Sequence, residues 1–310
     1  MNLYYIRPNR IAVAAILFWI GACVAAQTPP KDAPISHRGM DFEKASPDLE
    51  AIESSLRHEL ELHPESAPLL YRLGQVLRQE NKPKDSLETY TRAAGLEKPN
   101  AEQLRSVALD YVLLDDYDDA VHWLQVAVSF DPKNADVLYS LGRCFYSQSR
   151  YPEAEKMFLR VLQIKPDHLK AEENLGLIYD FVNRTDEAEA ALRKAVAWAG
   201  DESKDEWPFL DLGAFLLDHD RGAEAAPFLR RAAAIAPKCV ACHEKLGRSL
   251  VGTGDAAGGV KELEIAALLD PKNPKTHFQL GLAYRAAGAL DKSRAEFALS
   301  QSLYGEHSRE

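Results

Sequence analysis

The sequence has 310 residues, of which 46% are hydrophobic and 27% are charged, and this composition predicts a folded chain and excludes a disordered one. The formal net charge is −10 and the isoelectric point is near 5.5, which argues against nucleic-acid binding, because that affinity comes mostly from clustered lysine and arginine. Four cysteines are too few for a disulfide-rich scaffold.

The first 26 residues have the pattern of a secretory signal peptide. Arg7 and Arg10 precede an apolar run at 11–24, small residues follow, and cleavage is expected after Ala26. The run is shorter than the roughly 20 residues that span a bilayer. Two alternatives remain open: Cys23 becomes the acylated first residue of a bacterial lipoprotein, or the segment stays as an uncleaved anchor. All three interpretations predict an exported protein, periplasmic or secreted.

Residues 27–45 contain several prolines and little periodicity, so we expect a flexible linker there. A helix is predicted in the segment 46–65, because Ser46 is a suitable cap, Pro47 suits the first helical position and Asp48 lies near the positive end of the helix. This segment fits the second half of a helix pair whose first half is missing. Repeat arrays need such atypical capping pieces at their ends.

From residue 67 onward the chain follows a period of 34 residues. The tetrapeptide Asp-Pro-Lys-Asn starts at Asp131 and again at Asp270, a separation of 139 residues, or four periods plus three. Leu-Gly, or Val-Ala in its place, recurs in steps of 34 residues with one step of 37, at Leu73, Val107, Leu141, Leu175, Leu212, Leu246 and Leu280. Both the tetrapeptide and the Leu-Gly spacing therefore predict one insertion of three residues, which we place in a longer loop between Trp198 and Glu206.

Each period reads as two short amphipathic helices joined by a tight turn. In the segment 135–168, the pattern of Leu141-Gly142, Ala154, Phe158 and Pro166 resembles the tetratricopeptide repeat (TPR). The resemblance implies an all-α solenoid, in which neighbouring repeats stack into a right-handed superhelix. Seven repeats are expected over 67–307, with the ranges 67–100, 101–134, 135–168, 169–205, 206–239, 240–273 and 274–307.

The resemblance also implies that the first helices of the repeats line a concave groove for a protein or peptide partner. Arginine and tyrosine are frequent at the groove positions, and they can clamp carboxylates and supply rigid contact area, so an extended acidic peptide is expected. The alternative is that these are only the solvated faces of helices. The exposed groove positions, assigned by the register of the family, are Tyr71, Arg72, Gln75, Arg105, Tyr139, Arg143, Tyr146, Asn174, Phe181, Phe278 and Arg285.

The sharpest chemical signal is the run from Cys239 through Cys242 to His243. In an exported protein this C-x-x-C-H spacing is typical of covalent haem attachment, in which the histidine ligates iron. Against haem, His243 occupies the packing position between the helices of a repeat, and His277 occupies that position one repeat later without cysteines. A local disulfide is the favoured alternative, and unpaired thiols are the third. Cys144 is expected to be a small buried hydrophobic residue.

The sequence shows no pattern for catalysis or for a metal site. The leading hypothesis is therefore a non-enzymatic scaffold or assembly factor in the cell envelope, without a cofactor, and the alternative is a haem protein for electron transfer or sensing. Membrane attachment is expected only if Cys23 is lipidated or the signal is uncleaved. The last helix, at about 291–303, is expected to expose an additional apolar side, which would suit self-association.

Overall fold

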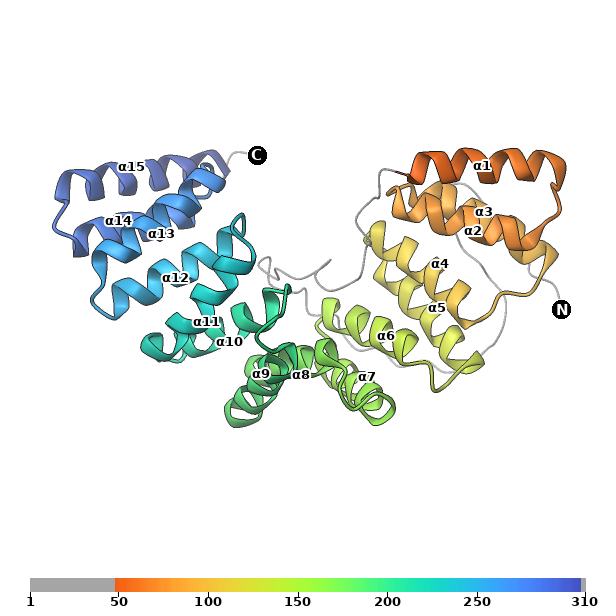
Figure 1. Ribbon diagram of the computed structural model, residues 1–310, viewed down its shortest axis with the longest axis horizontal. Coiled ribbons are helices and arrows are strands. Elements are labelled where there is room, and N and C mark those ends of the chain that lie inside the picture. The colour runs from red at the N-terminus through yellow and green to blue at the C-terminus, as the bar shows by residue number, and fades with distance from the viewer. Residues whose placement is uncertain (1–47, 308–310) are drawn as a thin grey trace. The chain divides into compact units, whose positions relative to one another are not determined.

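The computed structural model describes residues 48–307, and the described part of the chain is all-α (Figure 1). The expected signal segment 1–26, with Cys23, and the linker 27–45 lie outside the described residues. None of the helices in the described part is long and apolar enough to cross a membrane.

The described chain forms fifteen helices, and after α1 they alternate as the first and second helix of successive pairs. The bounds are α1 (Leu49–Leu62); α2 (Ala67–Gln79) and α3 (Pro83–Leu96); α4 (Ala101–Leu113) and α5 (Tyr117–Phe130); α6 (Ala135–Ser147) and α7 (Tyr151–Ile164); α8 (Leu169–Phe181) and α9 (Thr185–Ala199); α10 (Trp207–Asp218) and α11 (Gly222–Ile235); α12 (Val240–Gly252) and α13 (Ala256–Leu269); and α14 (Pro274–Ala286) and α15 (Leu290–His307).

The turn inside each pair contains one residue in the left-handed backbone region. Asparagine, aspartate and glycine adopt this region more readily than most residues do. The turn therefore depends on a local feature of the sequence, and it recurs in steps of 34 residues with one step of 37. The residues with positive φ at these turns are Asn81, Asp115, Ser149, Asn183, Asp220, Gly254 and Gly288.

The connection between α9 and α10 is longer than the other connections between pairs. It comprises residues 200–206, whereas the connections after α3, α5, α7, α11 and α13 have three residues fewer. The insertion therefore lies where both sequence markers predict it. Gly200 begins the loop with a φ of 68°, a value that glycine adopts without steric strain.

The glycine of the Leu-Gly pattern lets the two helices of a pair approach closely. A Cβ atom on Gly142 would lie 2.8 Å from Cε1 of Phe158 on the second helix, and one on Gly213 would lie 2.6 Å from Cδ2 of Leu229. Phe158 and Leu229 are fully buried. The glycine is therefore required by packing, in spite of its cost of about 1 kcal/mol in a helix.

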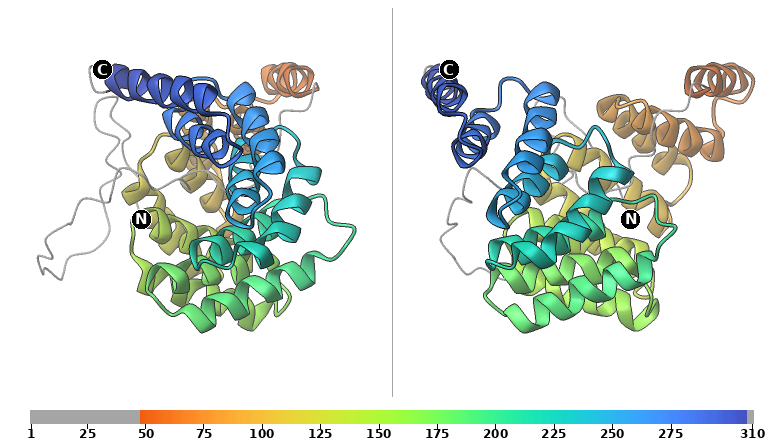
Figure 2. Two further views of the ribbon diagram at one scale, coloured as in Figure 1. Left: turned by 90° about the vertical axis from the view of Figure 1, so that its left-hand side faces the viewer. Right: turned by 60° about the vertical axis from the view of Figure 1, so that its left-hand side comes forward.

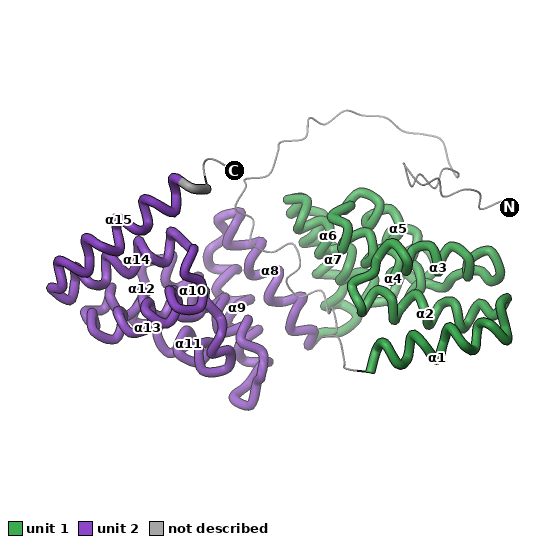
Figure 3. Tube along the Cα trace, turned by 90° about the horizontal axis from the view of Figure 1, so that it is seen from above, with its two compact units in different colours: residues 1–166 green, residues 167–310 purple. Residues whose placement is uncertain are grey.

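The helices form two compact units, residues 1–166 and residues 167–310 (Figure 3). The described part of unit 1 contains α1, packed on α2, and three helix pairs, and unit 2 contains four helix pairs (Figures 1 and 2). In unit 1, α2 contacts α4 and α4 contacts α6; in unit 2, α8, α10, α12 and α14 contact one another in succession. Within each unit the first helices therefore lie side by side and form a surface, which we call the first-helix face.

Candidate functional site

Four of the residues expected to be exposed in the groove are buried. Tyr71, Tyr139, Arg143 and Asn174 are between 2% and 8% exposed, so the expectation of exposure is wrong for them. Asn174 donates its amide to the carbonyl oxygen of Lys170 in its own helix, at 2.6 Å. The assignment of these residues to partner binding stays a prediction.

The two tyrosines are buried because their rings pack against the second helix of their own pair. The ring centroid of Tyr71 lies 6.0 Å from that of Tyr90, and Tyr139 lies 5.7 Å from Phe158. The Tyr71 hydroxyl also donates to the carbonyl oxygen of Glu97 at 2.8 Å. Its burial raises the pKa of Tyr71 to about 12. In unit 1 the aromatic rings of Tyr71 and Tyr139 therefore belong to the core.

The other expected groove residues keep part or all of their exposure. In unit 1, Arg72 is exposed, Arg105 is half-buried and donates to Glu102 at 2.9 Å, and Tyr146 is half-buried with its ring edge-on to Tyr151. Gln75 is also exposed. In unit 2, the exposed members are Phe181, Phe278 and Arg285.

Two of these residues belong to a stripe along α14, formed by the exposed Lys275, Phe278 and Arg285 and the half-buried Leu282. The spacing of three, seven and ten residues places them on one face of the helix. Phe278 is 45% exposed although its ring lies 5.5 Å from Phe297, and the Arg285 guanidinium lies 5.9 Å from the same Phe297 ring. The α14 stripe therefore has an apolar centre with a cation toward each end.

The neighbouring helix α12 presents the same positions one period earlier, and it contacts α14. These positions hold Ala241, Glu244, Arg248 and Val251. The Glu244 carboxylate accepts a hydrogen bond from the Thr276 hydroxyl. Arg248 lies 3.7 Å from an oxygen of Asp218 at an exposed site, an ion pair of small energy. Arg248 and Leu282 were not selected from the sequence, although their positions in the repeat could have identified them.

Cys239 and Cys242 are joined by a disulfide at the start of α12. Cys239 is the N-cap residue, and its Sγ accepts the backbone N–H of Cys242 at 3.1 Å. Cys242 is fully buried in the core of unit 2, whereas Cys239 is half-buried. Cys144 in unit 1 is also fully buried, and burial raises the pKa of its thiol to about 12.

His243 has a partner at each of its ring nitrogens. Its Nδ1 lies 2.7 Å from Oε2 of Glu262 on α13, and its Nε2 lies 3.1 Å from the carbonyl oxygen of Pro237. The residue is 6% exposed. His243 therefore ties the second helix of its pair to the connection that precedes α12.

His277 repeats this arrangement one period later. Its Nδ1 lies 2.7 Å from Oε2 of Glu296, and its Nε2 lies 3.0 Å from the carbonyl oxygen of Pro271. Because His277 makes these contacts without nearby cysteines, packing alone accounts for a histidine at this position. The residues around Cys239 do not fit a covalently attached haem, since both nitrogens of His243 are engaged and the two sulfurs are bonded to each other.

A buried carboxyl group, Asp110 on α4, contacts the preceding helix pair. Its Oδ2 lies 2.6 Å from Oγ of Ser86, and that Oγ also lies 2.7 Å from the carbonyl oxygen of Gly74. Ser86 has one hydroxyl proton, so both contacts are satisfied when Ser86 donates to Gly74 and a neutral Asp110 donates to Ser86. Burial raises the pKa of Asp110 to about 8, although Ser86 and Arg78 oppose the shift.

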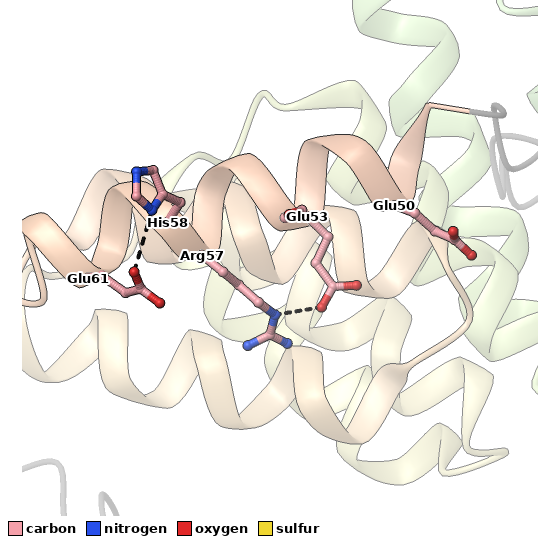
Figure 4. Close-up of a pocket in the computed structure, with 6 residues that line it drawn as sticks. Glu50, Glu53, Arg57, His58 and Glu61 are labelled. Atoms are coloured by element: carbon pink, nitrogen blue, oxygen red, sulfur yellow. Dashed lines mark hydrogen bonds and ion pairs between the residues drawn. The ribbon is translucent and has the colours of Figure 1, made fainter.

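A shallow depression runs along the exposed face of α1 and is lined by Glu50, Glu53, Ser54, Arg57, His58 and Glu61 (Figure 4). Arg57 donates to Glu53 at 2.6 Å, and Lys82 donates to the other oxygen of Glu53 at 2.8 Å. Hydrogen bonds from Lys82 and Arg57 lower the pKa of Glu53 to about 2. The ion pair between Glu53 and Lys82 therefore joins α1 to the turn between α2 and α3. In residues 48–307 no group of three or more histidine, cysteine, aspartate or glutamate side chains could hold a metal ion.

Comparison with known proteins identifies the repeats. The tetratricopeptide repeat family matches residues 134–199 and residues 244–305. The chain belongs to the tetratricopeptide-repeat family. Repeats of this family generally form scaffolds for protein–protein contacts and not enzymes, and the TPR fold supports that role here.

Solved structures agree with the TPR fold. A tetratricopeptide repeat protein from Parabacteroides merdae gives a TM-score of 0.60 at 18% identity and covers 76% of this chain and 92% of its own. PilW, a type IV pilus biogenesis factor, gives a TM-score of 0.59 at 19% identity, and the match covers 66% of this chain and 94% of the PilW chain. Among curated relatives, protein O-mannosyl-transferase TMTC3 of Mus musculus is 24% identical over 151 residues. That match spans 48% of this TPR chain and only 16% of the mouse protein.

Proposed function

We propose that this TPR protein is a non-enzymatic scaffold that binds a segment of a partner protein on the α12 and α14 part of the first-helix face in unit 2. The observation that carries the proposal is the α14 stripe, where exposed Phe278 and Arg285 lie on one helix face. Aromatic and arginine side chains are enriched among the residues that dominate protein interfaces.

The chemistry of the stripe selects the partner segment. Phe278 offers an apolar surface, and Arg285 and Lys275 offer donors that can bind carboxylates, in a chain whose net charge is −10. An extended segment with an apolar side chain next to an acidic one would match both features. The stripe belongs to a packed helix, so little conformational entropy of the receptor is lost on binding.

Site-specific photo-crosslinking tests this assignment. A photoreactive phenylalanine analogue at position 278 should capture one partner protein, identified by mass spectrometry. The same analogue at position 268 is the matched control, because Leu268 is 82% exposed on the second helix α13. Arg285→Glu should reduce the capture at position 278, whereas Arg230→Glu on the exposed face of α11 should not. Equal capture from both positions, or capture insensitive to Arg285→Glu, would contradict the proposed surface.

We also propose that the scaffold is exported and assists assembly in the cell envelope. The signal-peptide pattern of residues 1–26 supports export, and the similarity of fold to PilW, a pilus biogenesis factor, is consistent with an assembly role. The intact mass of the protein, expressed from the full sequence and recovered from separated cell fractions, tests the first part. A chain that begins at Gln27 or at lipidated Cys23 outside the cytoplasm supports export. A full-length chain in the cytoplasmic fraction contradicts it.

A further inference from the structure

We propose that Cys239 and Cys242 form a redox-active pair that exchanges its disulfide with a dithiol of a partner protein. The two residues are joined to each other at the first turn of α12. Two cysteines separated by two residues at a helix N-terminus form the arrangement in which thiolates become reactive. This activity would be additional to scaffolding and does not depend on the α14 stripe.

The two cysteine residues differ in exposure, and we infer different roles for their sulfurs from this difference. Cys242 is 0% exposed and packs in the core of unit 2. Cys239 is half-buried and keeps part of its surface exposed. An incoming thiolate can therefore reach Cys239, while Cys242 is shielded from any partner and can react only with Cys239.

The position of Cys239 stabilises the reduced form of the pair. Other first helices of the array carry a side-chain acceptor at the N-cap, for example Asn100, Asn134 and Asn273. Cys239 occupies the same position, and its sulfur accepts the N–H of Cys242 at 3.1 Å. A Cys239 thiolate would keep this hydrogen bond and lie at the positive end of the helix. Stabilisation of the reduced form makes a disulfide a stronger oxidant.

The disulfide is not needed to hold α12 in place. It closes a loop of only four residues, from 239 to 242, so it restricts the unfolded chain less than a long-range disulfide does. The start of α12 is also held by His243, which contacts Glu262 and the carbonyl oxygen of Pro237. A purely structural disulfide would add little at this position.

The exchange balances without any further reactant. A thiolate of the partner attacks Sγ of Cys239, the bond between Cys239 and Cys242 breaks, and Cys242 leaves as a thiolate that takes up a proton. The second thiolate of the partner then attacks the partner sulfur that is bonded to Cys239. This step forms the disulfide of the partner and releases Cys239 as a thiolate, which takes up a proton. Two electrons pass from the partner, whose two thiols become one disulfide, to the pair, whose disulfide becomes two thiols.

Disulfide transfer to a synthetic peptide with two reduced cysteines tests the proposal. The oxidised full chain and the peptide are mixed without oxygen, quenched by alkylation and weighed intact. We expect the peptide to become oxidised while Cys239 and Cys242 become alkylated. The double variant Cys239→Ser/Cys242→Ser is the control for the buried Cys144, and it should leave the peptide reduced. A wild-type protein that remains oxidised, or an equal transfer by the double variant, would overturn the proposal.

Single variants test the assigned roles of the two sulfurs. Cys242→Ser leaves the accessible sulfur and should form a mixed disulfide with a thiol-reactive aromatic disulfide at least about tenfold faster than Cys239→Ser does. Serine is a preferred N-cap, so Cys239→Ser should keep α12 folded, which circular dichroism checks. Equal rates for the two variants would refute the asymmetry. A covalent haem on either cysteine, in protein from a host able to mature c-type haem, would also overturn the proposal.

Discussion

Replacing Asp110 by asparagine should stabilise unit 1 at neutral pH. Asp110 is fully buried, and its carboxyl group contacts Ser86, whose hydroxyl also contacts the carbonyl oxygen of Gly74. Ser293 makes the same bond to the carbonyl oxygen of Gly281 in the last helix pair, which indicates that this serine donates to the glycine. An asparagine amide at position 110 can donate to Ser86 as the neutral acid does, and it has no charge to bury.

The magnitude follows from the raised pKa. Burial moves the pKa of Asp110 from 3.8 to about 8, so the folded chain holds a proton that the unfolded chain releases above pH 4. The stabilising effect of this proton is fully present below pH 3.8 and is lost as the pH rises through about 8. At pH 7 the loss amounts to about 4 kcal/mol, at about 1.4 kcal/mol per pH unit. Asp110→Asn should recover up to this amount at pH 7 and almost none at pH 4.

Hydrogen exchange of peptides from α3 and α4, measured from pH 4 to pH 8.5 and corrected for intrinsic rates, reports the local stability. The protection of the wild-type protein should fall across this range relative to that of Asp110→Asn. Glu88→Gln on the exposed face of α3 is the matched control, and it should follow the wild type. If wild type and Asp110→Asn show the same pH dependence, or if the variant is less stable at pH 7, Asp110 is ionised in the folded chain and the reasoning is refuted.

Two further predictions concern packing and the first helix. Gly142→Ala should lower the free energy of unfolding by about 1–3 kcal/mol, because the new Cβ would lie 2.8 Å from the buried Phe158 ring. Gly95→Ala is the control, and it should raise the free energy of unfolding by about 0.5–1 kcal/mol, because no atom lies within 4 Å of its new Cβ. Urea denaturation of the two variants and the wild type measures both changes. The Glu53–Lys82 contact should weaken as the pH falls below 4.5 toward 2, since Glu53 has a lowered pKa. Exchange of α1 amides should rise over that range in the wild type but change less in Lys82→Ala; equal changes would exclude the contact as the cause.

The helix pairs and their turns could be predicted because they depend on local sequence. The period fixes which residues of a helix are apolar, and the turn needs only one residue that tolerates a positive φ, such as Asn81 or Gly254. The insertion between α9 and α10 could also be predicted from local sequence. The Leu-Gly pattern and the Asp-Pro-Lys-Asn tetrapeptide both occur before and after it, and both are spaced three residues further apart than whole periods allow. The signal segment, the lipidation of Cys23 and the location of the protein stay predictions.

The exposure of individual residues could not be predicted from the period. Tyr71 and Tyr139 occupy first-helix positions that the register assigns to the groove, yet each packs on an aromatic ring of the second helix. Phe278 occupies the same position and has the same kind of partner, but it is 45% exposed. Position in a repeat limits which way a side chain points, and the neighbouring helices decide how much of it they cover.

The sequence alone determined the TPR architecture, the place of the insertion and the position of Cys239 and Cys242 at a helix start, because all three follow from spacing along the chain. Only the tertiary structure decided that Asp110 meets Ser86, 24 residues away, and that both nitrogens of His243 are occupied. These contacts join residues of different helices. Their distances depend on how closely the helices pack, which the glycines permit and the side chains of each particular pair determine.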